Sequence, residues 1–146
     1  MSILERVNSS EDIKKLSASE LEQFCREARA FLVDHISKTG GHLASNLGAV
    51  ELTVALHRVF DTSRDRLVFD VGHQCYAHKL LTDRYEGFDR LRQQGGVSGF
   101  PNPAESEHDA FVAGHSSTSI SVANGIAKAK ALTGDDSYTI AVIGDG

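Results

Sequence analysis

The sequence predicts an α/β protein in which an open parallel sheet is flanked by helices. Three short apolar runs, over residues 66–71, 109–114 and 138–143, read RLVFDV, DAFVAG and YTIAVI. None of them alternates polar with apolar residues, which is typical of parallel strands covered on both faces. Helical stretches separate the runs, and this alternation of strand and helix is the pattern of an open parallel sheet.

Two long helices are expected before the first strand. The first begins with Ser17 and Glu20 in capping-box spacing and ends at Gly40, a residue that tolerates the backbone of a helix end. Its apolar residues recur at steps of three and four, which indicates an amphipathic helix. The second, over residues 47–61, is apolar on nearly every side, so we expect it to be buried.

Shorter helical stretches are expected between the strands. The pattern places them at residues 73–85, 87–94 and 116–134. The last is rich in small residues and can therefore pack close to a sheet. Residues 95–109 contain several glycines, both prolines and no periodicity. A loop of that length in a compact domain tends to be a binding segment or a lid.

Composition limits the classes of function. A chain of 146 residues that is 40% hydrophobic fits one domain, which we place at residues 1–146. Its net charge of −5 argues against a nucleic-acid partner. We expect no membrane contact and a cytoplasmic location, because the sequence has neither an apolar run of roughly 20 residues nor a signal peptide. Cys25 and Cys75 form no C-x-x-C pair and are expected to be reduced thiols.

Each predicted strand ends at a glycine beside polar or ionisable residues. Ligands of open parallel sheets bind beyond the carboxyl ends of the strands, so these residues are candidates for one shared site. The candidates are His73 after the first strand, Gly114, His115 and Ser116 after the second, and Asp145 with Gly146 after the third.

The chemistry of these residues suggests a diphosphate held by Mg²⁺. A carboxylate such as Asp145 binds Mg²⁺, which usually bridges protein and phosphate oxygens. The serine-rich start of the helix after Gly114 offers backbone N–H groups to a phosphate. His73 and His115 can bond phosphate oxygens or transfer protons. Each of these motifs also has a purely structural alternative. Gly-Asp-Gly is a common turn sequence, the two histidines can be ordinary loop residues, and the serine-rich segment can be a simple helix cap.

The remaining histidines are less informative. His42 follows a glycine pair in a helix–turn–helix corner, where Ser45 or Asn46 can cap the next helix; the alternative is a histidine there by chance. We interpret His57 and His78, which sit in helical patterns, as structural or surface residues. His108 lies in the acidic end of the long loop, and the pattern assigns it no role.

Five segments in order resemble one enzyme family. They are GGHLASNLGAVELTVALH, DRLVFDVGHQCYAHKLLT, LRQQGGVSGFP, ESEHDAFVAGHSSTSIS and AVIGDG, which cover most of the chain from Gly40 onward. The chain resembles the N-terminal part of the 1-deoxy-D-xylulose-5-phosphate synthase family, thiamine-diphosphate enzymes of the transketolase-like group. The resemblance implies a thiamine-diphosphate-binding fold that is incomplete at the C-terminus.

The resemblance implies a role for each candidate residue. His42 is similar to the active-site histidine near the reacting carbons. The cofactor contacts would be His73, Gly114, His115 and Ser116, mainly around the diphosphate. Asp145 would be a Mg²⁺ ligand, and Gly146 would begin the backbone cradle beside it. The sequence departs from the family at Cys75, Ala77 and His108, where alanine, proline and an aromatic residue are more usual.

The implied reaction condenses pyruvate with D-glyceraldehyde 3-phosphate, with loss of carbon dioxide, in a homodimeric enzyme. Family members continue past Gly146 with an asparagine that completes the metal site, a glutamate that activates the thiamine ring, and two further domains. We therefore expect the chain alone to lack synthase activity and to bind thiamine diphosphate poorly. The alternatives are the N-terminal subunit of a split transketolase and a non-catalytic remnant that associates with a full-length partner.

Overall fold

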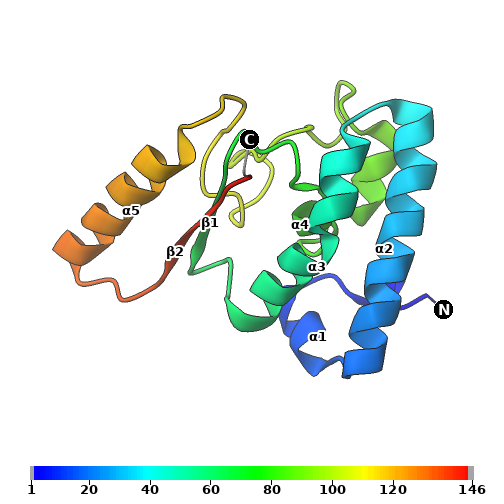
Figure 1. The fold of residues 1–146 in the computed structure, drawn as a ribbon, viewed down its shortest axis with the longest axis horizontal. Coiled ribbons are helices and arrows are strands. Elements are labelled where there is room, and N and C mark those ends of the chain that lie inside the picture. The colour runs from blue at the N-terminus through cyan, green and yellow to red at the C-terminus, as the bar shows by residue number, and fades with distance from the viewer. Residues whose placement is uncertain (1, 145–146) are drawn as a thin grey trace.

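The computed structural model describes residues 2–144 and shows a helical part beside a smaller part that contains the strands (Figure 1). The helices are α1 (Ser10–Lys15), α2 (Ala18–Thr39), α3 (Leu43–Val59), α4 (Tyr76–Leu80) and α5 (Ser119–Thr133), with 3-10 turns η1 (Leu4–Arg6) and η2 (Tyr85–Arg90). The strands are β1 (Arg66–Phe69) and β2 (Thr139–Val142). In this described part, no helix combines the length and apolarity needed to cross a bilayer.

Helix α2 confirms the predicted capping box. The Ser17 side chain accepts the N–H of Glu20, and the Glu20 carboxylate accepts the N–H of Ser17 at 2.9 Å. Phe24 and Leu32, on the apolar face, are fully buried. The helix ends at Gly40, whose φ of 75° favours glycine. Local spacing alone was enough to predict this element.

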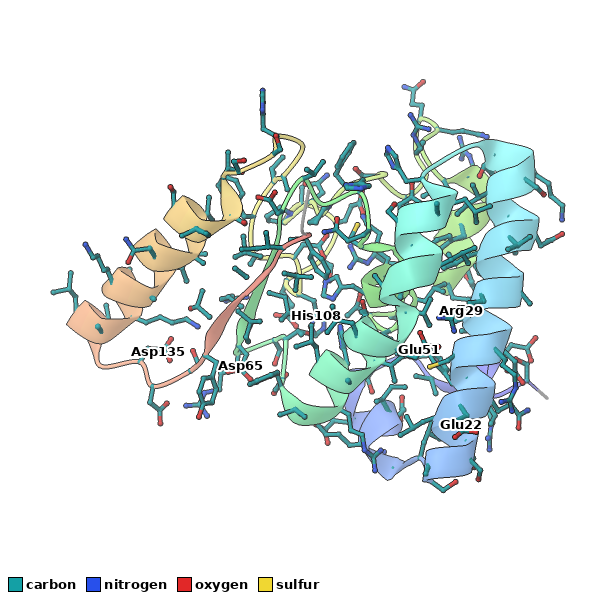
Figure 2. All side chains as sticks on the ribbon, in the orientation of Figure 1. Glu22, Arg29, Glu51, Asp65, His108 and Asp135 are labelled. Atoms are coloured by element: carbon teal, nitrogen blue, oxygen red, sulfur yellow. The ribbon has the colours of Figure 1, made fainter. Side chains whose placement is uncertain are left out.

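Helix α3 is only half buried, so the prediction that it is covered on every side is wrong. Val50 and Val54 pack in the core, whereas Leu52 and Val59 are 51% and 70% exposed. Helices α1, α2 and α4 pack against one side of α3, and the residues on its opposite side are exposed. An ion pair between Arg29 of α2 and Glu51 of α3 joins the two helices at their margin (Figure 2).

The sheet in the described residues consists of β1 and β2, which pair in parallel. Arg66 lies opposite Thr139 and Phe69 opposite Val142. Helix α5 connects to β2 and packs on both strands (Figure 1). This confirms a parallel α/β arrangement on a small scale.

The predicted strand at 109–114 is wrong, because that segment is irregular. Its first residue, Asp109, is buried, and its carboxylate accepts hydrogen bonds from Arg84 and His78. Its apolar residues Phe111 and Val112 are exposed. Long-range bonds to Asp109 therefore override the β propensity of the run.

Two predicted helices are shorter than expected. The stretch at 73–85 contains only α4, and the stretch at 87–94 overlaps the 3-10 turn η2. Asp83 and Arg92 have φ angles of 59° and 62°, which lie in the left-handed region. A residue in that region cannot continue a right-handed helix, so neither helical segment can extend past it.

Candidate functional site

Histidines 42 and 73 form a corner beside the start of α3. Their ring centroids lie 5.4 Å apart with the rings edge to face. The Tyr76 hydroxyl lies 3.4 Å from Nδ1 of His42. Burial lowers the pKa of His42, and the charges of His73 and Arg92 lower it further. His42 is therefore neutral at pH 7 and able to accept a proton.

Asn46 fixes the backbone of this corner. Its Nδ2 donates to the carbonyl oxygens of His42 at 2.6 Å and His73 at 2.7 Å, and its Oδ1 accepts the N–H of Tyr76 at 2.8 Å. The prediction that Asn46 caps α3 is wrong, because the helix begins at Leu43 with His42 at its N-cap. The partners of Asn46 lie up to 30 residues away, so no local signal could have revealed this role.

Replacing Asn46 with alanine is expected to lower the free energy of unfolding by about 2 kcal/mol, because it removes the partner of the His73 carbonyl and of the Tyr76 N–H at a buried position. Urea denaturation measures the loss. The matched control is Asn124→Ala, the same change at an exposed position of α5, which should leave stability unchanged or slightly higher. Equal effects from the two variants would contradict the role assigned to Asn46.

Asp70 links the end of β1 to the start of α5, and sequence reasoning missed it. Its carboxylate accepts the N–H of Ser117 at 3.1 Å and of Ser119 at 3.2 Å. Hydrogen bonds from the side chain and backbone of Ser119 and from the backbone of Ser117 lower the pKa of Asp70. The expectation that these N–H groups await a phosphate is therefore corrected: two of them already bind a carboxylate.

Gly72 shows how closely the surrounding segments approach. Its φ is 89°, and a Cβ there would lie 2.6 Å from Cδ of Pro101 and 3.0 Å from Cβ of Ala113. Only glycine fits such a position without displacing its neighbours. The residue before His73 and the residue before Gly114 are thus side by side.

A cavity of about 370 Å³ opens at the carboxyl end of β2. It is lined by α3, by His73 and Gln74, and by Val142, Ile143 and Gly144. Within residues 2–144, the buried atoms Nδ1 of His73 and Oε1 of Gln74 have no hydrogen-bond partner. Buried polar atoms are normally paired, whereas these two lack a partner in the described part of the chain.

The structure brings some of the sequence candidates together. His42 and His73 share the corner, and Gly114 follows the residue that packs on Gly72. His115 and Ser116 are exposed, in the loop that leads into α5. Asp145 and Gly146 lie outside the described residues. His57 and His78 are fully buried, which confirms a structural interpretation, and His108 hydrogen-bonds Thr62 at 2.8 Å.

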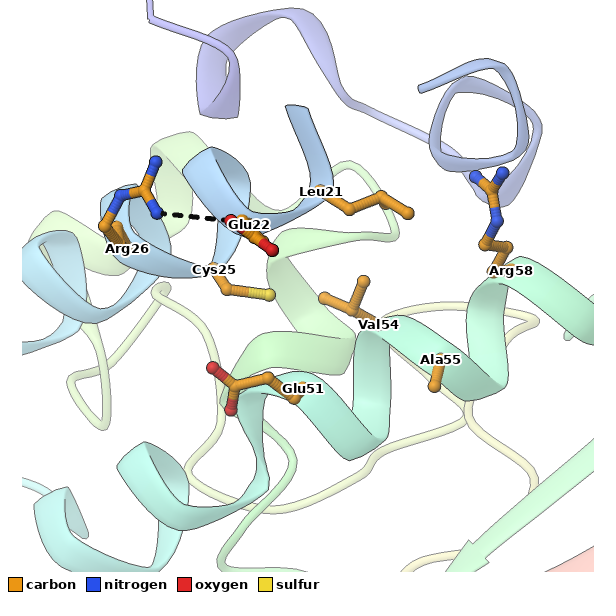
Figure 3. A pocket seen from close by; sticks show the side chains of 8 residues that line it. All are labelled: Leu21, Glu22, Cys25, Arg26, Glu51, Val54, Ala55 and Arg58. Carbon is orange, nitrogen blue, oxygen red and sulfur yellow. Dashed lines mark ion pairs between the residues drawn. The ribbon is translucent and has the colours of Figure 1, made fainter. Parts of the chain in front are cut away.

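A second cavity, of about 400 Å³, lies between α2 and α3, away from the corner (Figure 3). Leu21, Cys25 and Val54 form its apolar wall, and Glu22 at its rim pairs with Arg26 at 3.9 Å. Burial is the main cause that raises the pKa of the Cys25 thiol, so little nucleophilic thiolate forms there.

Both cysteines are free, as the sequence predicted, and both are buried. Burial raises the pKa of Cys75 to about 12. We expect Cys75 to react with an aromatic disulfide reagent more than about a hundredfold more slowly in the folded chain than in urea, because it must wait for unfolding. Absorbance of the released thiol measures both rates. Labelling of the folded chain at the rate seen in urea would contradict the burial of this side chain.

The fold and the site together define a class: α/β proteins with a polar ligand site at the carboxyl edge of a parallel pair of strands. A family model described as 1-deoxy-D-xylulose-5-phosphate synthase matches residues 4–146. The chain belongs to this family.

Three relatives, each named 1-deoxy-D-xylulose-5-phosphate synthase, illustrate the similarity. The protein from Dechloromonas aromatica is 61% identical over 144 residues, which are 99% of this chain and 23% of the relative. The protein from Azobacteroides pseudotrichonymphae is 57% identical over the same shares of both chains. The protein from Nocardia farcinica is 53% identical over 100% of this chain and 23% of the relative. The chain thus spans about a quarter of the length of these relatives.

Proposed function

We propose that a protein carrying this chain condenses pyruvate with D-glyceraldehyde 3-phosphate, with loss of carbon dioxide, to give 1-deoxy-D-xylulose 5-phosphate. In this proposal the chain supplies the diphosphate side of a thiamine diphosphate site. The observation that carries it is the cavity on the carboxyl edge of the strands, which is lined by His73, a residue whose buried Nδ1 has no partner among residues 2–144. Family membership supports the reaction.

The residues present fit the diphosphate of such a cofactor. His73, Gln74 and Gly144 line the cavity, and His73 and Gln74 each have one buried polar atom without a partner in the described part of the chain. Gly114, His115 and Ser116 would contact the diphosphate from the loop before α5. Asp145 would bind the Mg²⁺, with Gly146 beside it, and these two follow Gly144 directly in the chain.

Bound thiamine diphosphate would supply the carbon nucleophile and the electron sink for decarboxylation. The residues of this chain would bind, orient and exchange protons. His42 is neutral at pH 7, so its imidazole can accept a proton from a substrate oxygen and return it. Nδ1 of His73 would hold a phosphate oxygen, and the tight packing of Pro101 on Gly72 would keep water from that side. The homodimer implied by the family resemblance stays a prediction.

A chimera tests this proposal. This chain replaces the matching segment of the Dechloromonas aromatica relative, to which it is 61% identical. We expect the chimera to form 1-deoxy-D-xylulose 5-phosphate, and His42→Ala to lower kcat by about 10²–10⁴-fold, the usual contribution of a proton-transferring residue. The matched control, Glu22→Gln on the exposed face of α2, should retain full activity. A folded chimera whose turnover is unaffected by His42→Ala would contradict the role of His42.

The two alternatives predict different results. If the chain is the N-terminal subunit of a split transketolase, the chimera should transfer two-carbon units between ketose phosphates without decarboxylation. A non-catalytic remnant would bind a full-length synthase and leave its turnover unchanged. The names of the relatives favour the synthase over both.

A further inference from the structure

Four buried side chains from separate segments form one continuous chain of hydrogen bonds. Oγ of Ser10 lies 2.8 Å from Nδ1 of His57, and Nε2 of His57 lies 2.8 Å from Nδ1 of His78. Nε2 of His78 lies 2.9 Å from Oδ1 of Asp109. None of the four residues is more than 5% exposed. The chain therefore runs from α1, through α3 and α4, to the end of the long loop.

The direction of this hydrogen-bond chain follows from Asp109. Burial raises the pKa of Asp109, but hydrogen bonds from His78 and Arg84 outweigh it and keep the pKa below its ordinary value. An ionised carboxylate only accepts, so Nε2 of His78 carries the proton. Neutral His78 then accepts at Nδ1 from Nε2–H of His57, and His57 accepts at Nδ1 from the Ser10 hydroxyl. One tautomer of each ring satisfies every bond.

Residues 95–109, here called the strap, are held by two acidic residues of their own. Oδ2 of Asp109 accepts the N–H of Asn102 at 2.6 Å, and Arg84 donates to both oxygens of Asp109, at 2.7 and 2.8 Å. Glu105 accepts from Lys79 and from the N–H of Ser98, each at 2.7 Å. The strap is therefore pinned to α4 and the turn after it, and it is not a free lid.

The strap also forms a wall of the histidine corner. The ring of Phe100 lies 5.5 Å from the ring of His42, edge to face. Pro101 packs on Gly72, next to His73. Asn102, which donates to Asp109, follows Pro101 directly. By bonding Asn102, Asp109 thus also holds the two residues before it, Phe100 and Pro101, whose side chains touch the site.

We propose that His57 and His78 are positioning residues, which orient Asp109 and thereby hold the strap against the corner formed by His42 and His73. The identity of the ligand at that corner rests on the proposed function, but the positioning itself does not. If either imidazole ring were reversed, two acceptors or two donors would face each other. The chain of hydrogen bonds therefore favours a single position of the strap. The charged and titratable groups around the two rings are Asp109, Arg84, His108 and Lys14.

The first test needs no variant. Long-range proton–nitrogen spectra of the chain at pH 7 report which imidazole nitrogens carry protons. We expect protons on Nε2 of both His57 and His78, and unprotonated Nδ1 on both. A proton on Nδ1 of His78 would overturn the proposal, because the ring could not then link His57 to Asp109.

The second test compares three variants by amide hydrogen exchange. His57→Gln keeps an N–H donor toward His78, whereas His57→Leu removes it, and Ser10→Ala removes only the far end of the chain. For His57→Leu we expect exchange at Asn102 to rise about tenfold, the factor that corresponds to one lost hydrogen bond, and contacts between the Phe100 and His42 rings to weaken. His57→Gln and Ser10→Ala should stay within about twofold of the original rate.

The outcomes separate positioning from simple packing. If His57→Gln loosens the strap as much as His57→Leu, the volume of the imidazole matters and its donor does not, which overturns the proposal. If Asn102 exchange is unchanged in folded His57→Leu, the proposal is also wrong. If His57→Leu does not fold, the proposal is decided by the ring tautomers and by the Asn102 exchange rate of His57→Gln. These readouts need no cofactor, so they do not depend on the outcome of the chimera experiment.

Discussion

Replacing Asp109 with alanine is expected to lower the free energy of unfolding by about 3–5 kcal/mol, the usual cost of breaking a buried ion pair. The variant leaves the Arg84 guanidinium, 8% exposed, with only Glu105, at 3.5 Å, as a carboxylate partner. It also removes the acceptors for Nε2 of His78 and the N–H of Asn102. Urea denaturation followed by circular dichroism measures the loss.

The matched control is Asp136→Ala, which removes an exposed carboxylate that pairs with Arg64 on the surface. Surface pairs contribute little, so this variant should unfold at nearly the original urea concentration. Asp109→Asn should fall between the two, since it keeps the shape but loses the charge. A stability loss for Asp109→Ala no larger than that of Asp136→Ala would contradict the assigned importance of this carboxylate.

Lowering the pH from 7 to 5.5 is expected to cost roughly 2 kcal/mol of stability, because His57 and His78 are buried as neutral rings. Burial is the main cause that lowers the pKa of each; the nearby imidazole of His78 lowers the pKa of His57 further, because two protonated rings would repel each other, and the bond to Asp109 opposes the effect of burial at His78. In the unfolded chain both rings titrate near pH 6.5, at about their ordinary pKa. The unfolded state therefore binds more protons below that pH. Stability is present above it and is lost as the pH falls.

Urea midpoints measured in steps between pH 7.5 and 5 test this dependence. The variant His57→Gln removes one of the two titrating rings while keeping a donor toward His78, so its stability should fall less steeply over this range. The control Asn124→Ala, which changes no titratable group at an exposed position of α5, should retain the original slope. A stability curve that is flat from pH 7 to 5.5 would contradict the neutral buried pair.

Local patterns were enough to predict part of the fold. The capping box and apolar periodicity of α2 lie within one segment, and β1 and β2 are apolar runs followed closely by glycine. The run at 109–114 carries a similar signal but fails as a strand. Its outcome depends on Arg84 and His78, which lie 25 and 31 residues before Asp109 in the chain. No periodicity could reveal those partners.

The candidate site was predicted to a similar extent. Glycines next to polar residues indicated His42 and His73, which the structure brings to one corner. Asp70 was missed and Asn46 was given the wrong role, because each acts through backbone groups far along the chain. Asp70 bonds amides 47 and 49 residues away, and it thereby occupies two of the N–H groups that were expected to bind an anion at the start of α5. Spacing identifies reactive side chains better than it identifies the groups that hold them.

The central claim is that the segments after β1, before α5 and after β2 surround a single diphosphate. Titration of the isotope-labelled chain with thiamine diphosphate and Mg²⁺, at millimolar concentrations and followed by amide chemical shifts, tests it most directly. We predict that the amides of His73, Ser116 and Gly144 shift together, with one common dissociation constant. Shifts confined to one of these segments, different constants for the three, or no shifts at all would contradict the claim.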